Sequence, residues 1–398
     1  MCPPGLLRKE SDKRIEVNLY MIRVLHVADK LTVGDSTFHG VTQLFSWWIP
    51  RFDKSRYNVS VCSLRKRDKA GEYLEKLGIK VFYLNKWKFD PFTLSSLLSL
   101  IKNERIDILH LHGYGSWTFG RIAGLFSRTP IVVHEHMVDR NIPIYQRIVD
   151  HMLSGTTTRG IAVSDAVKDF MVNCRGLRRD RVKVAENGIP LESFLLNAGK
   201  KPPNETATEW LAKLRIPLNH KIVGAIGRLN PVKGYNYYLE AAKKVLREYS
   251  QVRFLIVGDG ELRQSLEKMA RRLGIARHVE FTGHCEDVAP LLSIMDIMVI
   301  ASLSEGGPIT LFEAMASGCA VISTNTIGLK HKIKDGQTGF LVPPENSNAI
   351  ARKLLQLLKD SDLCKAMGGR AKEVSHQYDI RNTVRQLEEC YEEVLRQR

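Results

Sequence analysis

The sequence predicts two doubly wound α/β domains joined by a polar linker. Short, nearly continuous apolar strands alternate with helical segments, this alternation occurs twice, and a polar stretch with two prolines separates the two halves. Nearly continuous apolar strands are typical of parallel sheets that are covered on both faces. The chain has 398 residues, which is enough for two or three domains of about 150 residues, each with its own core.

The predicted strands follow in chain order. In the first half they cover residues 22–27, 57–64, 79–84, 106–112, 131–136, 160–164 and 182–187, with helices between them such as 91–104 and 143–153. In the second half they cover residues 221–227, 252–258, 278–283, 296–302, 320–324 and 339–342. The linker is the segment "NAGKKPPNETATEW" at 197–210.

These elements set the expected domain boundaries. We expect a flexible extension at 1–20, a first domain at 21–196, a second domain at 197–378, and a C-terminal helix within 379–398 that packs back on the first domain. No run approaches the roughly 18 apolar residues of a membrane span, and the first 20 residues lack the apolar core of a signal peptide. Seven scattered cysteines without a C-x-x-C pair favour a reducing cytoplasm.

The net charge of +16 is uneven. Residues 1–200 carry 31 basic and 20 acidic side chains, whereas residues 201–398 carry 28 and 23. A basic block runs from Arg51 to Lys88, and Trp47 and Trp48 precede it. Such a block is either a solvated face or a surface that attracts phosphates, anionic lipid or an acidic acceptor. We expect no nucleic-acid partner and a cytoplasmic protein, with peripheral attachment to the inner face of an anionic membrane as an open alternative.

Polar residues cluster where the predicted strands end. The second half offers Arg228 and Lys233 in "GRLNPVKG", a glycine turn in "GDGELR", and Thr282-Gly283-His284. The first half offers histidine pairs at 110/112 and 134/136. Ligands bind beyond the carboxyl ends of strands in open α/β sheets. With two such domains, we expect a site in the cleft between them that holds a diphosphate with an attached sugar.

The stretch "SEGGPITLFEAMASG" at 304–318 predicts a helix with an anion site at its start. Pro308 suits the first helical position and Gly318 the position after the end. Gly306 and Gly307 allow close approach to the helix N-terminus, where free N–H groups favour an anion. Glu305 precedes the helix and Glu313 lies within it; on local evidence each is either a solvated carboxylate or part of the site.

The sequence does not match the motifs of other nucleotide-binding or metal-binding sites. "GDGELR" has arginine where the dinucleotide fingerprint needs its third glycine, and no P-loop occurs. "DSD" at 360–362 is better explained as a helix cap than as a metal-binding D-x-D. The histidine pairs lack a neighbouring acidic or cysteine cluster, so we expect no metal site.

Five segments carry a family resemblance: "GRLNPVKG", "GDGELR", "SEGGPITLFEAMASG", "DGQTGFLVP" and "AVSDAVKDFM…RVKVAENGIPLESF". In this order they resemble the retaining GT-B glycosyltransferases of the group 1 type, glycosyltransferase family 4, from Met21 to the C-terminus. The resemblance implies two Rossmann-like domains that face each other across a cleft. It also implies transfer of a sugar from a nucleoside diphosphate sugar, usually UDP-linked, to a sugar or lipid-linked acceptor in polysaccharide, glycan or glycolipid synthesis.

The resemblance further implies catalytic roles. Arg228 and Lys233 would neutralise the donor diphosphate, so that no metal or other cofactor is needed. Glu305 would bind the hydroxyls of the donor sugar, and His134 would face that sugar in the cleft.

The remaining implied residues bind the donor. Glu313 would hold the ribose hydroxyls and Gly40 would let the first loop approach the donor. Residues that line the diphosphate or border the base are Gly306, Gly307, Pro308, Thr282 and Gly283. Two positions depart from the family pattern, His39 in place of a glycine and Lys330 in place of a glutamate. Two other functions remain open: a nucleotide-sugar epimerase of similar fold, or a non-catalytic carbohydrate- or lipid-binding partner subunit.

Overall fold

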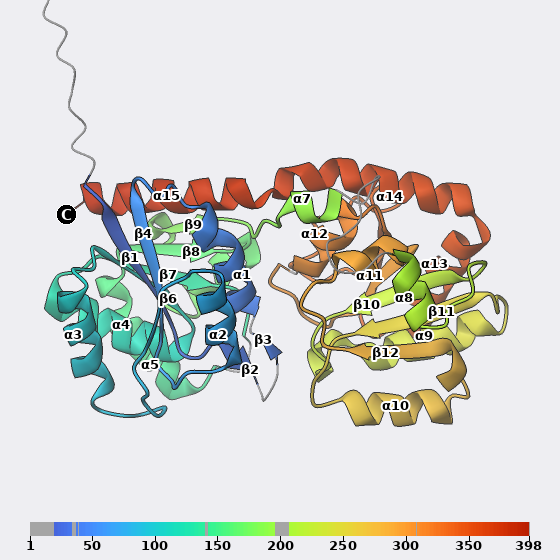
Figure 1. The fold of residues 1–398 in the computed structure, drawn as a ribbon, viewed down its shortest axis with the longest axis horizontal. Coiled ribbons are helices and arrows are strands. Elements are labelled where there is room, and N and C mark those ends of the chain that lie inside the picture. The colour runs from blue at the N-terminus through green and yellow to red at the C-terminus, as the bar shows by residue number, and fades with distance from the viewer. Residues whose placement is uncertain are drawn as a thin grey trace, which may run out of the picture.

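The computed structural model describes residues 20–33, 37–38, 40–139, 142–195, 207–307 and 309–397. These residues form two α/β domains that lie side by side (Figure 1). The predicted extension, except for Tyr20, and the segment 196–206 of the linker region lie outside the described residues. The predicted fold class is therefore confirmed, while the exact domain boundaries stay a prediction.

The first domain is built on a seven-stranded parallel sheet in the order β5-β4-β1-β6-β7-β8-β9. Its strands are β1 (Ile22–Ala28), β4 (Tyr57–Ser63), β5 (Val81–Tyr83), β6 (Ile108–His112), β7 (Ile131–Glu135), β8 (Arg159–Ala162) and β9 (Val182–Val184). A separate two-stranded ribbon consists of β2 (Thr32–Val33) and β3 (Thr37–Phe38). The central strands are buried on both faces, as their apolar sequences predict.

The second domain contains a six-stranded parallel sheet in the order β12-β11-β10-β13-β14-β15. Its strands are β10 (Lys221–Ile226), β11 (Val252–Val257), β12 (Val279–Gly283), β13 (Ile297–Ile300), β14 (Ala320–Thr324) and β15 (Phe340–Val342). The strand order reverses direction beside β10, which is the point where doubly wound sheets open a crevice for ligands.

Helices cover both sheets (Figure 1). In the first domain they are α1 (Gly40–Trp48), α2 (Lys69–Lys76), α3 (Thr93–Asn103), α4 (Tyr114–Ser127), α5 (Ile144–Leu153) and α6 (Asp165–Asn173). The next helix, α7 (Leu191–Leu195), packs on the second domain, because Leu191 and Phe194 are buried in one core with Leu291 and Phe312. The second half adds α8 (Ala207–Lys213), α9 (Tyr235–Leu246), α10 (Arg263–Arg272), α11 (Ala289–Ile294), α12 (Ile309–Ala316), α13 (Ser347–Lys359), α14 (Ser361–Ser375) and α15 (Ile380–Arg396). Asp360 accepts a hydrogen bond from Leu363 N at 2.9 Å, so "DSD" does cap a helix.

The last helix returns to the first domain. Figure 1 shows α14 and α15 along one edge of both domains, with α15 against the strands of the first. Val384, Leu387 and Tyr391 of α15 are buried in the same core as residues of β1 and β6. At the crossing, Ile189 N donates to Tyr378 O at 2.8 Å and Ile380 N donates to Ile189 O at 2.9 Å. The two segments that connect the domains are thus bonded to each other.

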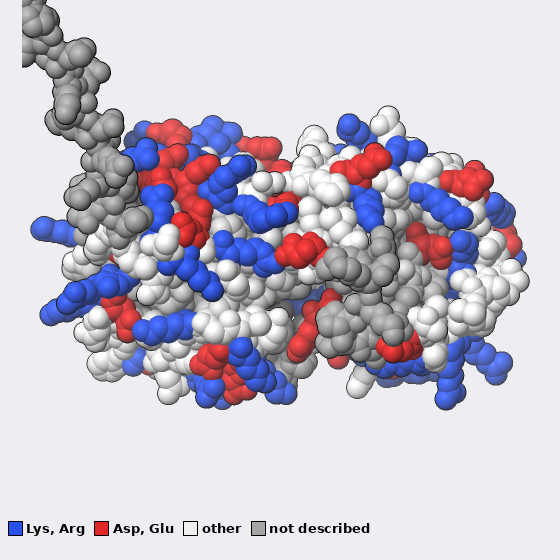
Figure 2. Space-filling model, turned by 45° about the horizontal axis from the view of Figure 1, so that its top comes forward, with Lys and Arg blue, Asp and Glu red and all other residues white. Residues whose placement is uncertain are grey.

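Several cations of the basic block from Arg51 to Lys88 are paired with carboxylates, which the sequence alone did not predict. Arg51 pairs with Glu192, Arg56 with Glu392, Arg65 with Asp29, Arg67 with Glu75 and Lys80 with Glu104. Figure 2 shows acidic side chains among the basic ones on the half of the molecule that holds the first domain. Trp48 is fully buried, so it belongs to the core and not to a membrane face. In the described part of the chain, no helix has the length and apolar character that crossing a bilayer requires.

The burial of α15 gives a stability prediction. Leu387 has no exposed surface. Leu387→Ala should lower the free energy of unfolding of the first domain by about 2–5 kcal/mol, because it leaves a cavity in that core. Urea denaturation followed by circular dichroism measures the change. Arg385→Ala is the control, since this exposed side chain lies 4.0 Å from exposed Glu389 and has no other ion pair within the described residues. Equal stabilities of the two variants would contradict a structural role for α15.

Candidate active site

Two loops at the carboxyl ends of β10 and β11 form the floor of the site. Gly227 N donates to Val257 O, and Leu229 N donates to Asp259 O, both at 2.9 Å. A Cβ on Gly258 would lie 2.0 Å from Gly227 O, and the φ of Gly258 is +136°. Only glycine fits a backbone that is both this close to its neighbour and in this conformation. The "GDG" turn therefore holds the Arg228 loop in place, which explains these glycines without a dinucleotide fingerprint.

A small group of charges lies above this floor. Lys233 Nζ is 2.6 Å from Glu305 Oε1, and Ser302 Oγ donates to the same oxygen at 2.6 Å. The side chain of Glu305 is only 10% exposed, compared with 25% for Lys233. Arg228 is exposed and has no ion-pair partner among the described residues. The predicted cations and the carboxylate are thus gathered at one strand edge, with Lys233 already bound to Glu305.

The glycine turn after Glu305 touches the first domain. A Cβ on Gly306 would stand 2.6 Å from His136 O and 2.8 Å from Met137 Cα, both at the end of β7. A Cβ on Gly307 would stand 3.6 Å from Val163 Cγ2. The turn therefore brings the start of α12 against strand ends of the opposite sheet. Pro308 lies outside the described residues, and Gly318 has the predicted positive φ, +79°, after α12.

Glu313 is a buried carboxylate inside α12. It is 2% exposed, and among the described residues it has no hydrogen-bond or ion-pair partner. Burial, with a smaller contribution from the charge of Asp287, raises its pKa to about 8. Asp287 belongs to the loop after β12, and Thr282 and Gly283 are the last two residues of that strand. Gly283 has a φ of +80°, and its carbonyl accepts from Gly258 N at 2.8 Å.

The position of His134 corrects the sequence-based prediction. His134 is fully buried inside the first domain, where its ring stacks on Trp48 at 5.4 Å and on His110 at 5.3 Å. It therefore does not face the cleft. His136 on the same strand face is only half-buried, and its carbonyl contacts Gly306. In the sequence, His136 lies two residues beyond His134, just after the carboxyl end of β7. This position is the signal that could have identified His136 as the histidine beside the second domain.

Gly40 is exposed at the start of α1, and the space around its missing Cβ is open. No described contact brings it to Glu305 or Lys233. Its predicted approach to a donor stays a prediction.

The raised pKa of Glu313 makes stability depend on pH. A folded-state pKa of about 8, above the ordinary glutamate value of 4.5, means that the carboxyl favours folding while it is protonated. That contribution is complete below about pH 4.5 and is lost as the pH rises through 8. Glu313→Gln cannot ionise, so its melting temperature should match that of the wild type near pH 5 and exceed it increasingly toward pH 8. Thermal unfolding of both proteins across this range checks this. A constant difference, or a variant that is less stable at pH 8, would contradict it.

Two family models match the chain. Residues 40–193 match "Glycosyltransferase Family 4", and residues 206–374 match "Glycosyl transferases group 1". The chain is 27% identical over 284 residues to an Escherichia coli enzyme named UDP-Gal:alpha-D-GlcNAc-diphosphoundecaprenol alpha-1,3-galactosyltransferase, covering 69% of this chain and 72% of that one. It is 28% identical over 319 residues to N-acetyl-alpha-D-glucosaminyl L-malate synthase of Bacillus anthracis, covering 78% and 81%.

Solved structures agree on the fold. HepE of Anabaena, crystallised with UDP, superimposes with a TM-score of 0.79 at 21% identity and covers 92% of this chain and 99% of its own. A glycosyltransferase from Rickettsia africae gives a TM-score of 0.80 at 22% identity, with 94% and 99% covered. The matched models, the named relatives and the two facing sheets lead to one conclusion: this chain belongs to the group 1 glycosyltransferases of GT-B fold and is a glycosyltransferase.

Proposed function

We propose that this enzyme transfers a sugar from a UDP-linked donor to a sugar or lipid-linked acceptor, with retention at the anomeric carbon and without a metal ion. The observation that carries the proposal is the Lys233–Glu305 pair beside the glycine turn at the start of α12, with exposed Arg228 in the same loop as Lys233. Uridine is supported by HepE, which was crystallised with UDP and glucose, and by the UDP-galactose in the name of the E. coli relative. A lipid-linked acceptor is supported by the diphosphoundecaprenol in that same name.

The diphosphate would bind between Arg228 and Lys233. Arg228 is exposed and without an ion-pair partner in the described chain, so its full charge is available to a ligand. Lys233 now pairs with Glu305, and a phosphate oxygen would compete for its ammonium group. Charge-assisted bonds to phosphate are roughly twice as strong as neutral ones. The fixed cations and the free N–H groups of α12 can then stabilise the departing nucleoside diphosphate.

When a phosphate oxygen replaces Glu305 as the partner of Lys233, the Glu305 carboxylate would become available to bind the sugar. The sugar is attached to the diphosphate, so it must lie next to the two cations, which is where Glu305 stands. A carboxylate there can accept bonds from sugar hydroxyls and favours positive charge that develops at the anomeric carbon. No second carboxylate is assigned to form a covalent intermediate, so we favour attack from the face that the leaving group departs from, which retains configuration.

Glu313 and the loop after β12 would bind the nucleoside. Ribose hydroxyls are donors, and Glu313 is a buried acceptor that lacks a partner among the described residues. Thr282 and Gly283 would border the base. Gly306, Gly307 and Pro308 would line the diphosphate, and Gly40 would approach from the first domain. The family match favours a transferase over an epimerase or a non-catalytic partner subunit.

The role of Glu305 is testable. Glu305→Gln keeps the shape but removes the charge, so kcat should fall on the order of 100-fold while affinity for UDP stays near normal. Steady-state kinetics with UDP-sugars and calorimetry with UDP measure the two effects. Ser302→Ala is the control, because it removes a hydrogen bond to Glu305 but leaves the charge in place. It should lose much less activity.

The same assay tests the rest of the proposal. Wild-type activity should survive EDTA, and proton NMR of the first product should show the anomeric configuration of the donor. Wild-type turnover by Glu305→Gln would remove this residue from the mechanism. An inverted product would contradict retention, and an activity that needs an added divalent ion would contradict the metal-free site.

A lipid-linked acceptor requires contact with a membrane, and α5 provides a surface that suits one. Asp150 is the only buried side chain of this helix, whereas Ile144, Tyr145, Ile148 and Met152 are 55% to 77% exposed. A helix on a domain surface normally buries its apolar side. In α5 the apolar side chains are exposed and the charged Asp150 is buried instead.

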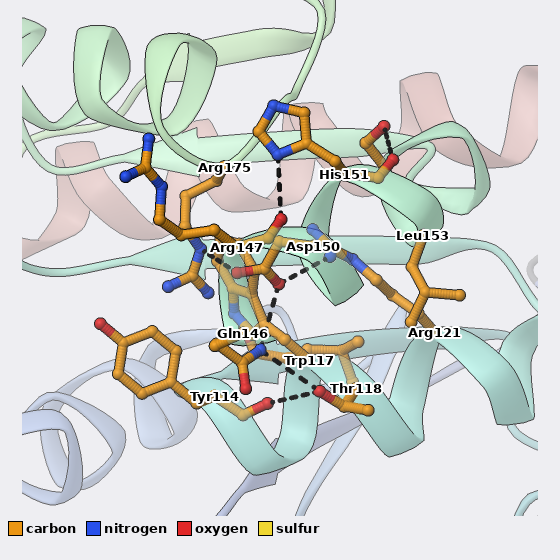
Figure 3. A network of polar contacts seen from close by, with 12 residues as sticks. Tyr114, Trp117, Thr118, Arg121, Gln146, Arg147, Asp150, His151, Leu153 and Arg175 are labelled. Carbon is orange, nitrogen blue, oxygen red and sulfur yellow. Dashed lines mark hydrogen bonds and ion pairs between the residues drawn. The ribbon is translucent and has the colours of Figure 1, made fainter. Parts of the chain in front are cut away.

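Asp150 explains how α5 stays attached in this orientation (Figure 3). Arg121 Nη1 donates to Asp150 Oδ1 at 3.2 Å, and Arg175 Nε lies 2.9 Å from Asp150 Oδ2. Both guanidinium groups are fully buried, and that of Arg175 lies over the ring of Trp117 at 4.0 Å. The buried ion pairs hold the helix, so its apolar side chains are left outside. We propose that this face enters an anionic bilayer at the cytoplasmic surface, since its exposed charged side chain, Arg147, is basic.

Vesicle binding tests the α5 surface. The double variant Ile148→Ser, Met152→Ser should bind phosphatidylglycerol vesicles at least about ten-fold more weakly than the wild type, because it removes apolar area that would be buried. Leu218→Ser, which alters an equally exposed apolar residue of the second domain, should bind normally. Sedimentation at low salt measures binding, which added salt should weaken. Equal binding to neutral phosphatidylcholine vesicles, or no loss in the double variant, would contradict the proposal.

A further inference from the structure

The segment that follows β7 and meets the Gly306 turn is held by a carboxylate. We call residues 136–139 the exit segment. Glu135 is the last residue of β7, and its side chain is 12% exposed. His136 N donates to Glu135 Oε1 at 3.1 Å, and Met137 N donates to the same carboxylate. The main chain of His136 and Met137 is also what the Gly306 turn contacts. Glu135 therefore fixes the part of the first domain on which that turn rests.

Arg175 supplies a positive charge beside this carboxylate. It lies just after α6, is fully buried, and places Nη1 3.6 Å from Glu135 Oε2. Figure 3 shows Arg175 close to Asp150 and Tyr114. Its guanidinium lies 4.5 Å from the centre of the Tyr114 ring, and the hydroxyl of Tyr114 donates to Asp139 Oδ2 at 2.6 Å. Arg175 thus reaches both ends of the exit segment, one through Glu135 and the other through Tyr114.

The charge of Arg175 contributes more here than its hydrogen bonds do. Its Nε, Nη1 and Nη2 atoms are buried without a hydrogen-bond partner among the described residues. Burial raises the pKa of the Glu135 carboxyl, and the charge of Arg175 acts against this shift. A buried carboxylate is costly unless a positive charge compensates it. Without Arg175, the ionised Glu135 side chain would turn toward water and release the two N–H groups.

Arg121 provides a comparison within the same network. It is fully buried like Arg175, its Nη1 donates to Asp150 Oδ1 at 3.2 Å, and its guanidinium lies over the Trp117 ring at 4.7 Å. Among the described residues, no ion pair joins Arg121 to Glu135. Two arginines therefore share the attachment of α5, whereas Arg175 also compensates the carboxylate at the end of β7.

We propose that Arg175 is a positioning residue for the transfer reaction: its charge keeps Glu135 in place, and the exit segment then fixes the Gly306 turn and Glu305. The inference rests on the proposed function only in assigning Glu305 to the donor sugar. No described contact joins Arg175 to the second domain, so it acts through the main chain of the exit segment. A Cβ on Gly306 would already collide with His136 O, so a shift of this segment must move the turn.

Hydrogen exchange of the full chain tests this link without requiring activity. Arg175→Met keeps a long side chain and removes the charge. In this variant the amides of residues 136–139 and 303–307 should exchange at least about ten-fold faster than in the wild type. Arg121→Met is the matched control, because it also loosens Asp150 but does not pair with Glu135. It should speed exchange in α5 and leave the other two segments unchanged.

Mass spectrometry of peptic fragments measures these rates. Wild-type rates at 136–139 in Arg175→Met, or the same acceleration there in Arg121→Met, would overturn the proposal.

A double variant isolates the charge of Arg175. In Arg175→Met, Glu135→Gln there is no carboxylate to compensate, and the amide oxygen still accepts from the main chain. The exchange of residues 136–139 should therefore return to within about three-fold of the wild type. A role of Arg175 in packing alone predicts no such recovery, and its absence would overturn the proposal.

Glu135→Ala covers the case in which Arg175→Met does not fold. It removes the acceptor of the two N–H groups but leaves Arg175 paired with Asp150. Exchange of residues 136–139 should again be faster, and unchanged exchange would overturn the proposal.

Kinetics give the second readout, with an acceptor in detergent micelles so that no bilayer is needed. Arg175→Met should lower kcat about 10- to 100-fold with little change in KM for the donor or in affinity for UDP, because a displaced Glu305 affects the transition state most. Arg121→Met should keep kcat near the wild-type value. Equal losses of kcat in both variants would overturn the positioning role. If the wild type transferred no sugar, the exchange rates would still decide whether Arg175 holds the exit segment.

Discussion

The contact between the Gly306 turn and the end of β7 determines how the site is assembled. The main chain of the second domain comes so close to His136 and Met137 that a single methyl group on Gly306 would collide with both. This contact brings the N-terminus of α12 and Glu305 to the strand ends of the first domain. A second contact supports it, because a Cβ on Gly328 would lie 2.2 Å from Glu305 O. The carboxylate therefore stands on a turn that is confined from two sides.

The two glutamates of this region have opposite environments. Glu305 is bound by Lys233 and Ser302, so its charge is compensated within the protein. Glu313 lacks such partners in the described chain, and burial raises its pKa. A buried polar group without a partner is costly, and such groups concentrate where a ligand completes them. This difference is a physical reason to assign the two residues to different parts of one donor.

The first domain uses polar interactions where a domain normally uses apolar packing. Asp150 holds α5 through two buried guanidinium groups, and Tyr391 joins α15 to His110 of β6. In both cases a helix is oriented by directional bonds, which fix its rotation more strictly than apolar contact does. One consequence is an exposed apolar face on α5, and the other is a direct link between α15 and a central strand of the sheet.

The sequence by itself determined the class of fold, the order of strands and helices, and the loops that carry the charged residues. Strand and helix periodicity, proline and glycine positions, and family motifs are all local signals, and Arg228, Lys233 and Glu305 were found from them. Only the tertiary structure decided that His134 lies inside the first domain, whereas His136, just after β7, has its main chain against Gly306. It also decided that five cations of the basic block pair with carboxylates and that α5 turns its apolar side outward. These features depend on partners far along the chain, such as Glu392 for Arg56 and Arg175 for Asp150. Contacts of that kind leave no periodic pattern in the sequence, because they arise only when distant segments meet.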